Sequence, residues 1–368
     1  MKVRVKDLEE GCVIAENIMG LTSKPIVRKN TMLTTLHIEV LQAFQIKHIA
    51  VSTKKADGSI FFAEAVDETL SNQKSEDTET GFAPEKAPKS FENLYTDAVV
   101  LYKNEFSNWQ AGSKVDIVAL KKSILPLVER VSSDQLCLYR LHQLPEAEDY
   151  LSNHSVSVGL ISSLLAKKLG CSQGLCIQMA MAGLLADTGM AKMPKSLLDK
   201  SSGLSQEEQV EIRKHPVYSY QFIMDSALLK QDVKRAIYQH HERLDGSGYP
   251  KGEKGNHITL YSQIIALADV YHAMTTKRLY RSKQSPFKAL ETILEDEFGK
   301  FDIVVVKALQ KLIGNLATGT RVELSNGTLA EVIYTQSEYL SRPIVKTIPV
   351  GDIIDLTRQR KLYIDRVV

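Results

Sequence analysis

The spacing of hydrophobic and polar positions changes along the chain. In residues 1 to about 66 the period is mostly two, with short apolar runs at 12–15 and 48–51, and only residues 36–44 have helical spacing. A period of two is typical of strands that are buried on one face. This part of the sequence therefore predicts a small, β-rich α+β module.

The middle of the chain, residues 93–317, follows the helical period instead. In residues 158–169 apolar side chains recur at every third or fourth position, and Gly170 supplies a stop signal. Ser205 and Glu208 have the spacing of a capping box at the start of a helix. Further apolar stripes predict helices near residues 175–186, 205–225, 230–241, 259–276 and 285–297.

Two remaining segments complete the predicted organisation. Residues 67–92 are polar, charged and poor in apolar side chains, which predicts a flexible linker. After residue 318 the period returns to two, and Asn326-Gly327 favours a two-residue hairpin turn. The predicted parts are an accessory module, a linker, a mainly helical domain and a small β element, at 1–66, 67–92, 93–317 and 318–368, with C-terminal strands near 344–348 and 362–367.

The composition narrows the classes of protein to consider. Hydrophobic residues make up 43% of the 368 residues and charged residues 24%, which is the balance of a soluble globular protein. A net charge of +2 argues against a nucleic acid polymer as partner, and no apolar stretch is long enough to predict a membrane span. The first residues lack the apolar core of a signal peptide, and the four cysteines form no CxxC pair and no regular framework, which together favour a reducing cytoplasm.

Histidines and aspartates concentrate in the helical block. His240 and His241 are adjacent, and neighbours on a helix diverge by about 100°, so each can face a different ion of a two-metal site. Asp187 and Asp269 follow apolar runs, where a carboxylate is costly to bury unless it meets a cation. Imidazoles mixed with carboxylates suit divalent ions such as iron, manganese, nickel or zinc.

Each of these residues also has an ordinary structural explanation. His142 and His257 are expected to be solvent-exposed side chains without a role in a site. Asp187 alone could cap a helix end, and a histidine pair alone seldom binds a metal. The metal hypothesis therefore depends on the co-occurrence of these residues within one helical block.

The residues in this block resemble the HD-GYP domain, a subgroup of the HD superfamily of metal phosphohydrolases that degrades cyclic di-GMP. The run His240-His241-Glu242-Arg243-Leu244-Asp245-Gly246-Ser247-Gly248-Tyr249-Pro250 matches the signature of that family almost letter for letter. Supporting segments follow in the family's order at 150–156, 197–216, 268–271 and 278–281. The resemblance covers residues 141 to about 315, just under half of the chain.

The resemblance implies a mainly α fold, an all-helical HD bundle flanked by the two small β-containing parts. It implies a divalent ion, iron, manganese or similar, and substrate contacts from Arg278, Arg281 and Tyr249, since an arginine fork can donate two hydrogen bonds to a phosphate. The loop Gly248-Tyr249-Pro250 would border the site and could also meet a partner protein. The implied metal ligands are His154, Asp187, His215, His240, His241 and Asp269, with Asp187 also catalytic.

The sequence departs from the family at several positions. The defining His-Asp pair is Ala186-Asp187 here, and the lysine that follows it in the family is Met190. An alanine cannot coordinate a metal and a thioether cannot donate to a phosphate. Tyr150 stands where some members have a carboxylate, and His272 stands where an aspartate is common. Disturbing only a hydrogen-bond partner of a ligand costs about 10–100-fold, so one metal position is expected to be weak and one ion well held.

Two functions remain open at this point. The first is a cyclic di-GMP phosphodiesterase whose activity is reduced by the missing histidine. The second is a degenerate protein that binds cyclic di-GMP or a metal for signalling without turnover. A scaffold without ligands is less favoured, because a scaffold has no physical need for so many histidines beside aspartates. The apolar stripe in residues 93–135 is compatible with a homodimer, although such stripes more often pack inside the core.

Overall fold

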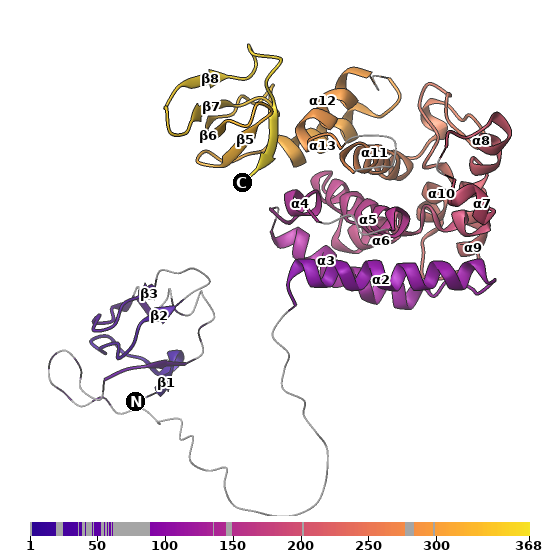
Figure 1. Ribbon diagram of the computed structural model, residues 1–368. Helices are drawn as coiled ribbons and strands as arrows, with labels where there is room; N and C mark the ends of the chain where they lie inside the picture. The colour runs from indigo at the N-terminus through magenta and orange to yellow at the C-terminus, as the bar shows by residue number, and fades with distance from the viewer. Residues whose placement is uncertain are drawn as a thin grey trace, which may run out of the picture. The chain divides into compact units, whose positions relative to one another are not determined.

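The structure, a computed structural model, divides into two compact units, Met1–Pro84 and Glu85–Val368 (Figure 1). The division places the C-terminal strands in the same unit as the helices. The structure describes residues 2–19, 25–35, 37–38, 41, 46, 48–52, 55, 57, 59, 61, 89–134, 136–144, 149–200, 202–276, 283–296 and 299–368. Most of the predicted linker and most of the predicted helix at 36–44 lie outside these residues.

The N-terminal unit contains two short antiparallel strand pairs. Strand β1 (Lys2–Arg4) pairs with β4 (His48–Ala50), and β2 (Ile18–Met19) pairs with β3 (Pro25–Val27). A one-turn helix, η1 (Val5–Asp7), follows β1. The side chains that these elements bury together include Val3, Ile14, Leu33, Leu41 and Val51. The strands at 2–4, 25–27 and 48–50 lie where the period of two predicts them.

The second unit is built mainly of helices, which confirms the predicted fold class. Helices α5 (Tyr150–Lys168) and α6 (Gln173–Leu185) lie between α2 and α3 on one side and α11 and α13 on the other (Figure 1). The remaining helices are α2 (Phe91–Gln110), α3 (Ile117–Ser133), α4 (Leu136–Leu141), η2 (Thr188–Lys192), α7 (Lys195–Leu198), α8 (Gln206–Ile212), α9 (His215–Ile223), α10 (Gln231–Gln239), η3 (Gly255–His257), α11 (Leu260–Thr275), α12 (Pro286–Asp296) and α13 (Ile303–Gly314).

Helix α5 is the centre of this unit and is buried around its whole circumference from Ser152 to Ala166, not along one stripe as its pattern predicts. It approaches α6 closely because two glycines face each other. A Cβ atom on Gly159 would lie 2.7 Å from the carbonyl oxygen of Ala180, and one on Gly183 would lie 2.7 Å from that of Val158. The two backbones can therefore touch only without these side chains.

Helix ends follow the signals in the sequence. Ser205 and Glu208 form the predicted capping box, and α8 begins at Gln206. Gly170 has a φ of +78°, the left-handed conformation that ends α5 without steric cost. The predicted helix at 205–225 is two helices, α8 and α9, because the chain turns at residues 213–214. This break places His215 at the first position of α9.

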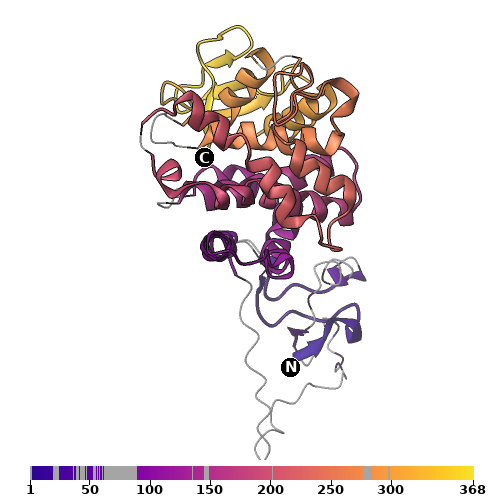
Figure 2. The ribbon, with the colours of Figure 1, turned by 90° about the vertical axis from the view of Figure 1, so that its right-hand side faces the viewer.

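A five-stranded antiparallel sheet closes the chain, in the order β8-β7-β6-β5-β9. Its strands are β5 (Arg321–Leu324), β6 (Leu329–Tyr334), β7 (Ile344–Thr347), β8 (Ile353–Asp355) and β9 (Ile364–Val367). Gly327, with a φ of +81°, makes the predicted turn between β5 and β6. The sheet lies against α12 and α13 (Figures 1 and 2), and a buried ion pair of 2.7 Å from Arg342 Nε to Glu291 Oε1 joins it to α12.

One stretch among the described residues, Gln173–Lys192, is long and apolar enough to cross a membrane by composition alone. It comprises α6 and η2, and 67% of its most apolar window is buried inside the helical unit. Burial of this kind is typical of a core helix in a globular domain, so this stretch serves the interior of the fold.

Candidate metal centre

Five helical segments bring the predicted ligands to one place. His154 lies on α5, Asp187 follows the end of α6, His215 opens α9, His240 and His241 follow α10, and Asp269 lies on α11. Four of these residues each place one potential ligand atom within 4.8 Å of the others, namely Asp187, His215, His240 and His241. His154 joins this group through Asp187, and Asp269 joins it through His241.

Two carboxylates face the imidazole rings. Asp187 Oδ1 is 3.2 Å from His215 Nε2 and 3.6 Å from His240 Nε2, and Asp187 Oδ2 is 3.6 Å from His154 Nε2. Asp269 Oδ1 is 2.9 Å from His154 Nε2, while its Oδ2 is 3.7 Å from His241 Nδ1. The two carboxylates thus hold one continuous cluster, which we call the His/Asp cluster.

The turn that carries Asp187 is fixed against α9. The hydroxyl of Ser219 donates to the carbonyl oxygen of Ala186 at 2.6 Å, and the hydroxyl oxygen of Ser219 accepts the N–H of Gly189 at 2.8 Å. Gly189 has no room for a Cβ atom, which would lie 2.5 Å from the backbone nitrogen of Ser219. This close approach of η2 to α9 sets Asp187 beside His215.

Backbone carbonyls orient two of the imidazoles. His215 Nδ1 lies 2.7 Å from the carbonyl oxygen of Ile212, and His240 Nδ1 lies 2.6 Å from that of Ile237. A carbonyl oxygen can only accept, so each Nδ1 carries the hydrogen and each Nε2 of the neutral ring presents a lone pair. These Nε2 atoms are 3.2 Å apart and face Asp187. Two lone pairs and a carboxylate at this distance repel unless a positive charge lies among them, so the donor set fits a divalent cation.

The electrostatic state of the cluster suits this role. Burial raises the pKa of Asp187, but the facing imidazoles of His215, His240 and His154 outweigh burial and hold that pKa well below its usual value. Burial also raises the pKa of Asp269, but the hydrogen bond with His154 and the nearby histidine rings outweigh burial, so the pKa of Asp269 is lowered. Burial, together with the nearby His240, lowers the pKa of His241 well below its ordinary value. The ionised carboxylates and the neutral His241 ring are the protonation states that bind metals.

The Gly-Tyr-Pro loop lies directly on the cluster. The ring of Tyr249 stacks on His241, with centroids 4.6 Å apart, and the guanidinium of Arg213 lies 5.3 Å from the Tyr249 ring centroid. Gly248 is required because a Cβ atom there would lie 2.5 Å from the backbone nitrogen of Arg243. The peptide bond before Pro250 is cis. The loop therefore forms one wall of the candidate centre.

Two side chains beside the histidine pair, which the motif alone did not single out, hold the following segment in place. The buried carboxylate of Glu242 accepts the backbone N–H groups of Lys251 and Glu253 at 2.8 and 3.0 Å. Gln239 donates to the carbonyl oxygen of His257 and accepts from the hydroxyl of Ser262 at 2.8 Å. A charged residue inside the signature, as Glu242 is, was the available signal, because a buried charge must have partners.

Two of the positions that depart from the family pattern, Ala186 and Tyr150, lie next to cluster residues. Ala186 is buried at the end of α6 and offers no donor atom to the cluster. The Nζ of Lys192, the nearest lysine after Met190, lies 5.2 Å from the ring centroid of Phe222. Tyr150 places its hydroxyl 3.2 Å from His154 Nδ1. Arg278 and Arg281, the predicted phosphate contacts, lie outside the described residues.

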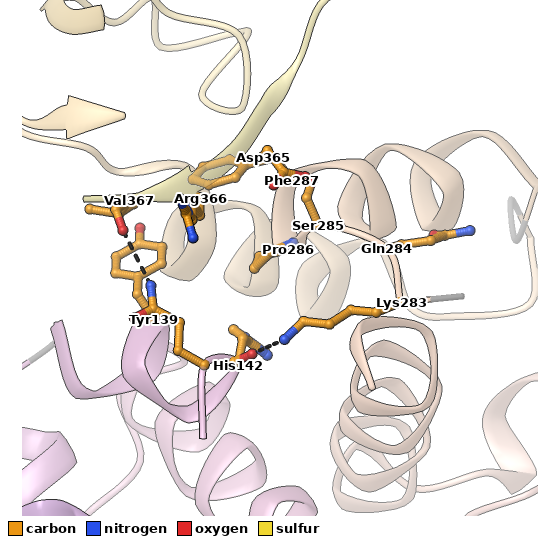
Figure 3. Close-up of a pocket in the computed structure, with 11 residues that line it drawn as sticks. Tyr139, His142, Lys283, Gln284, Ser285, Pro286, Phe287, Asp365, Arg366 and Val367 are labelled. Atoms are coloured by element: carbon orange, nitrogen blue, oxygen red, sulfur yellow. Dashed lines mark hydrogen bonds between the residues drawn. The ribbon is translucent and has the colours of Figure 1, made fainter. Parts of the chain in front are cut away.

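A large cavity lies apart from the cluster. Its volume is about 410 Å³, and it lies between α4, the start of α12 and β9, with Tyr139, Lys283 and Arg366 in its wall (Figure 3). His142 also lines it, and the expectation of a solvated His142 is wrong. The ring is only 6% exposed, and its Nε2 lies 3.1 Å from the hydroxyl of Tyr271. Burial, followed by the charge of Lys283, lowers the pKa of His142 to about 3, so the ring packs as a neutral core group.

Comparison with known proteins agrees with this architecture. Residues 141–305 match the family described as HD domain. The chain is 31% identical over 254 residues to the cyclic di-GMP phosphodiesterase PA4108 of Pseudomonas aeruginosa, covering 66% of this chain and 61% of that protein. It is 27% identical over 207 residues to the cyclic di-GMP phosphodiesterase PdeB of Borreliella burgdorferi, covering 56% and 54%. The matches thus span little more than half the length of these relatives.

A solved structure has a similar fold. The HDG"Y"P protein Bd1817 from Bdellovibrio bacteriovorus superposes with a TM-score of 0.50 at 18% identity, covering 84% of this chain and 97% of that one. The alanine at position 186 distinguishes this chain from the family's His-Asp pattern. Residues 141–305 are therefore an HD domain, and the chain is similar to cyclic di-GMP phosphodiesterases and to an HDG"Y"P protein, with Ala-Asp in place of the His-Asp pair.

Proposed function

We propose that this protein is a metal-dependent phosphodiesterase that hydrolyses cyclic di-GMP, with turnover reduced by the absence of a histidine at position 186. The observation that carries the proposal is the position of the Nε2 atoms of His215 and His240, which are 3.2 Å apart and face Asp187. The Nε2 lone pairs and the ionised carboxylate of Asp187 would repel one another without a cation among them. The phosphodiesterases PA4108 and PdeB among the relatives support the substrate class.

The proposed ligands are His154, Asp187, His215, His240, His241 and Asp269, and the proposed ions are iron or manganese. A divalent ion bound there would lower the pKa of a water molecule and offset the negative charge of a phosphodiester. In hydrolysis the water oxygen bonds to phosphorus, one P–O ester bond breaks, and the cyclic dinucleotide opens to a linear one. The water gives up a proton, and the departing ribose oxygen takes one up.

The side chains of this protein contribute position and charge to that reaction. Asp187 stays ionised, so its carboxylate can accept a hydrogen bond from the attacking water. This hydrogen bond orients a lone pair of the water oxygen toward phosphorus. Tyr249 and Arg213 form an aromatic and cationic surface at the edge of the cluster, where a guanine base or a phosphate would lie. Arg278 and Arg281 remain predicted phosphate contacts.

A second function is favoured by one observation. Ala186 supplies no donor atom, and Met190 no positive charge, at positions where the family has a ligand and a lysine. Because two-metal hydrolysis uses one ion at the attacking oxygen and one at the leaving oxygen, a single well-held ion would support binding better than turnover. The alternative is a catalytically inactive protein that binds cyclic di-GMP for signalling.

One experiment separates these functions. The full chain is loaded with Mn²⁺ or Fe²⁺, its metal content is measured by elemental analysis, and cyclic di-GMP is followed by liquid chromatography. His240→Ala removes a proposed ligand, and His257→Ala, which changes an exposed histidine outside the cluster, is the matched control. Hydrolysis that His240→Ala abolishes and His257→Ala preserves supports the phosphodiesterase. Tight nucleotide binding without product supports the inactive binder, and a protein that binds neither a metal ion nor cyclic di-GMP would refute both.

A further inference from the structure

Two side chains of helix α11 contact the two ring nitrogens of His154. Asp269 and His272 are three residues apart and therefore share one face of the helix. Asp269 Oδ1 is 2.9 Å from His154 Nε2, and His272 Nδ1 is 2.9 Å from His154 Nδ1. His154 and His272 are only 4% and 5% exposed, so water has little access to either contact.

A third side chain extends this contact. The Nε2 atom of His272 lies 3.1 Å from the hydroxyl oxygen of Thr276, which follows α11. His154, His272 and Thr276 thus form a chain of hydrogen bonds that leads away from the cluster. His215 and His240 differ from His154, because a backbone carbonyl that can only accept fixes the hydrogen on each of their Nδ1 atoms.

Counting hydrogens gives two arrangements for this chain. Each neutral imidazole carries one N–H, and only one hydrogen can lie between the two Nδ1 atoms. In the first arrangement His154 Nε2–H donates to Asp269, and His272 Nδ1–H donates to His154. In the second, His154 Nδ1–H donates to His272, His272 Nε2–H donates to Thr276, and His154 Nε2 presents a lone pair. Only the second arrangement lets His154 coordinate a cation.

We propose that His272 is a positioning residue that switches the tautomer of His154 from the first arrangement to the second when a divalent cation binds. The inference rests on the proposed function, since it requires a cation at His154 Nε2. The switch also gives a physical reason for a histidine at position 272, where an aspartate is common. Its ring accepts a hydrogen bond in the loaded protein, as a carboxylate would, and donates one in the metal-free protein, as a carboxylate cannot.

The contact with Tyr150 is the competing explanation. Its hydroxyl lies 3.2 Å from His154 Nδ1 and its ring stacks on that imidazole at 5.2 Å. A hydroxyl can accept the Nδ1 hydrogen too. The distance from His272 is shorter, and His272 has Thr276 to receive the hydrogen that it must carry on Nε2. The competing explanation predicts that His272 keeps its hydrogen on Nδ1 in the loaded protein.

The test uses nitrogen-15-labelled histidine in the full chain, with Zn²⁺ as a diamagnetic probe, and assigns each tautomer by NMR. We expect His154 to carry its hydrogen on Nε2 without metal and on Nδ1 with Zn²⁺, while His272 changes from Nδ1 to Nε2. A His272 that keeps its hydrogen on Nδ1 when Zn²⁺ is bound would overturn the inference. This result is independent of hydrolysis, so a failed activity assay with the expected tautomers would refute only the proposed function.

Variants give a second measurement, the affinity for Zn²⁺ by competition with a chromogenic chelator. His272→Phe keeps a flat ring without nitrogen atoms and should weaken binding by about 10–100-fold. His272→Asp restores an acceptor for His154 Nδ1–H and should recover most of the affinity. His257→Phe is the exposed control and should bind like the unaltered protein. Unchanged affinity in His272→Phe would contradict the inference, and the tautomer measurement on the unaltered protein still decides it if that variant does not fold.

Discussion

Replacing Gly189 by alanine tests how the fold places Asp187 beside His215. An alanine Cβ would lie 2.5 Å from the backbone nitrogen of Ser219 and also inside the contact distance of the His215 carbonyl oxygen. Both atoms belong to the backbone of α9, so neither can rotate away. Since atoms in contact are about 3.5 Å apart, α9 has to move by on the order of 1 Å relative to η2.

The expected effect follows from that displacement. Moving a catalytic group by about 1 Å costs on the order of 100-fold in rate, and overpacking costs about 1–3 kcal/mol of stability. We therefore expect Gly189→Ala to fold with a lower free energy of unfolding in urea. We also expect it to lose most of its Mn²⁺ affinity and its cyclic di-GMP hydrolysis. The two losses are linked because His215 and Asp187 would no longer be 3.2 Å apart.

The same substitution at a glycine with free space around it separates the effect of the steric clash from the effect of replacing a glycine. Gly174 lies in α6, and a Cβ atom there would meet nothing within 4 Å. Gly174→Ala should be neutral or stabilise the helix by about 0.5–1 kcal/mol, with unchanged metal affinity. If Gly189→Ala bound Mn²⁺ and turned over substrate as well as Gly174→Ala does, the proposed link between the η2 turn and the cluster would be refuted.

Four further predictions concern the site and the fold. Ala186→His should raise cyclic di-GMP turnover by about tenfold or more; no gain in a hydrolysis assay would show that the missing ligand is not the main defect. Dialysis against a chelator should abolish hydrolysis, and Mn²⁺ should restore it, as chromatography of the product would show. Arg342→Met leaves the buried carboxylate of Glu291 with only Lys288, 3.6 Å away, as a cationic partner and should lower the free energy of unfolding in urea by up to about 3 kcal/mol; an unchanged urea midpoint would contradict this. The lowered pKa of His142, about 3, means that only the unfolded chain takes up its proton as the pH falls below 6.5. Stability should therefore drop by about 2 kcal/mol between pH 7 and pH 5, and His142→Gln should remove that part in urea titrations at the two pH values.

The sequence predicts much of the fold because its local signals agree with the tertiary structure. The capping box at Ser205 and the turn at Gly327 occur where their patterns place them. The full burial of α5 was not predicted, because serines and histidine interrupt its apolar stripe and tertiary contacts decide their burial. Strand β8 was missed, since its few residues, Ile353–Asp355, are too short for a period to be recognised.

The candidate site was predicted by residue type more than by geometry. A motif names His240 and His241 as donors, but the nitrogen that each one presents depends on carbonyl groups that only the folded chain brings near, such as that of Ile237. The contact between His154 and His272 joins residues far apart in sequence, and no spacing rule predicts it. His142 was predicted to be solvated, because a single histidine carries no sign of its burial.

Both the proposed hydrolysis and the proposed tautomer switch require a cation held among His215, His240 and Asp187. Crystals of the full chain grown with Mn²⁺ and measured at the manganese absorption edge would test this directly. We expect an anomalous peak in the His/Asp cluster, within coordination distance of both Nε2 atoms and of Asp187. Density for Mn²⁺ elsewhere, or none in a cluster whose side chains keep their positions, would contradict it.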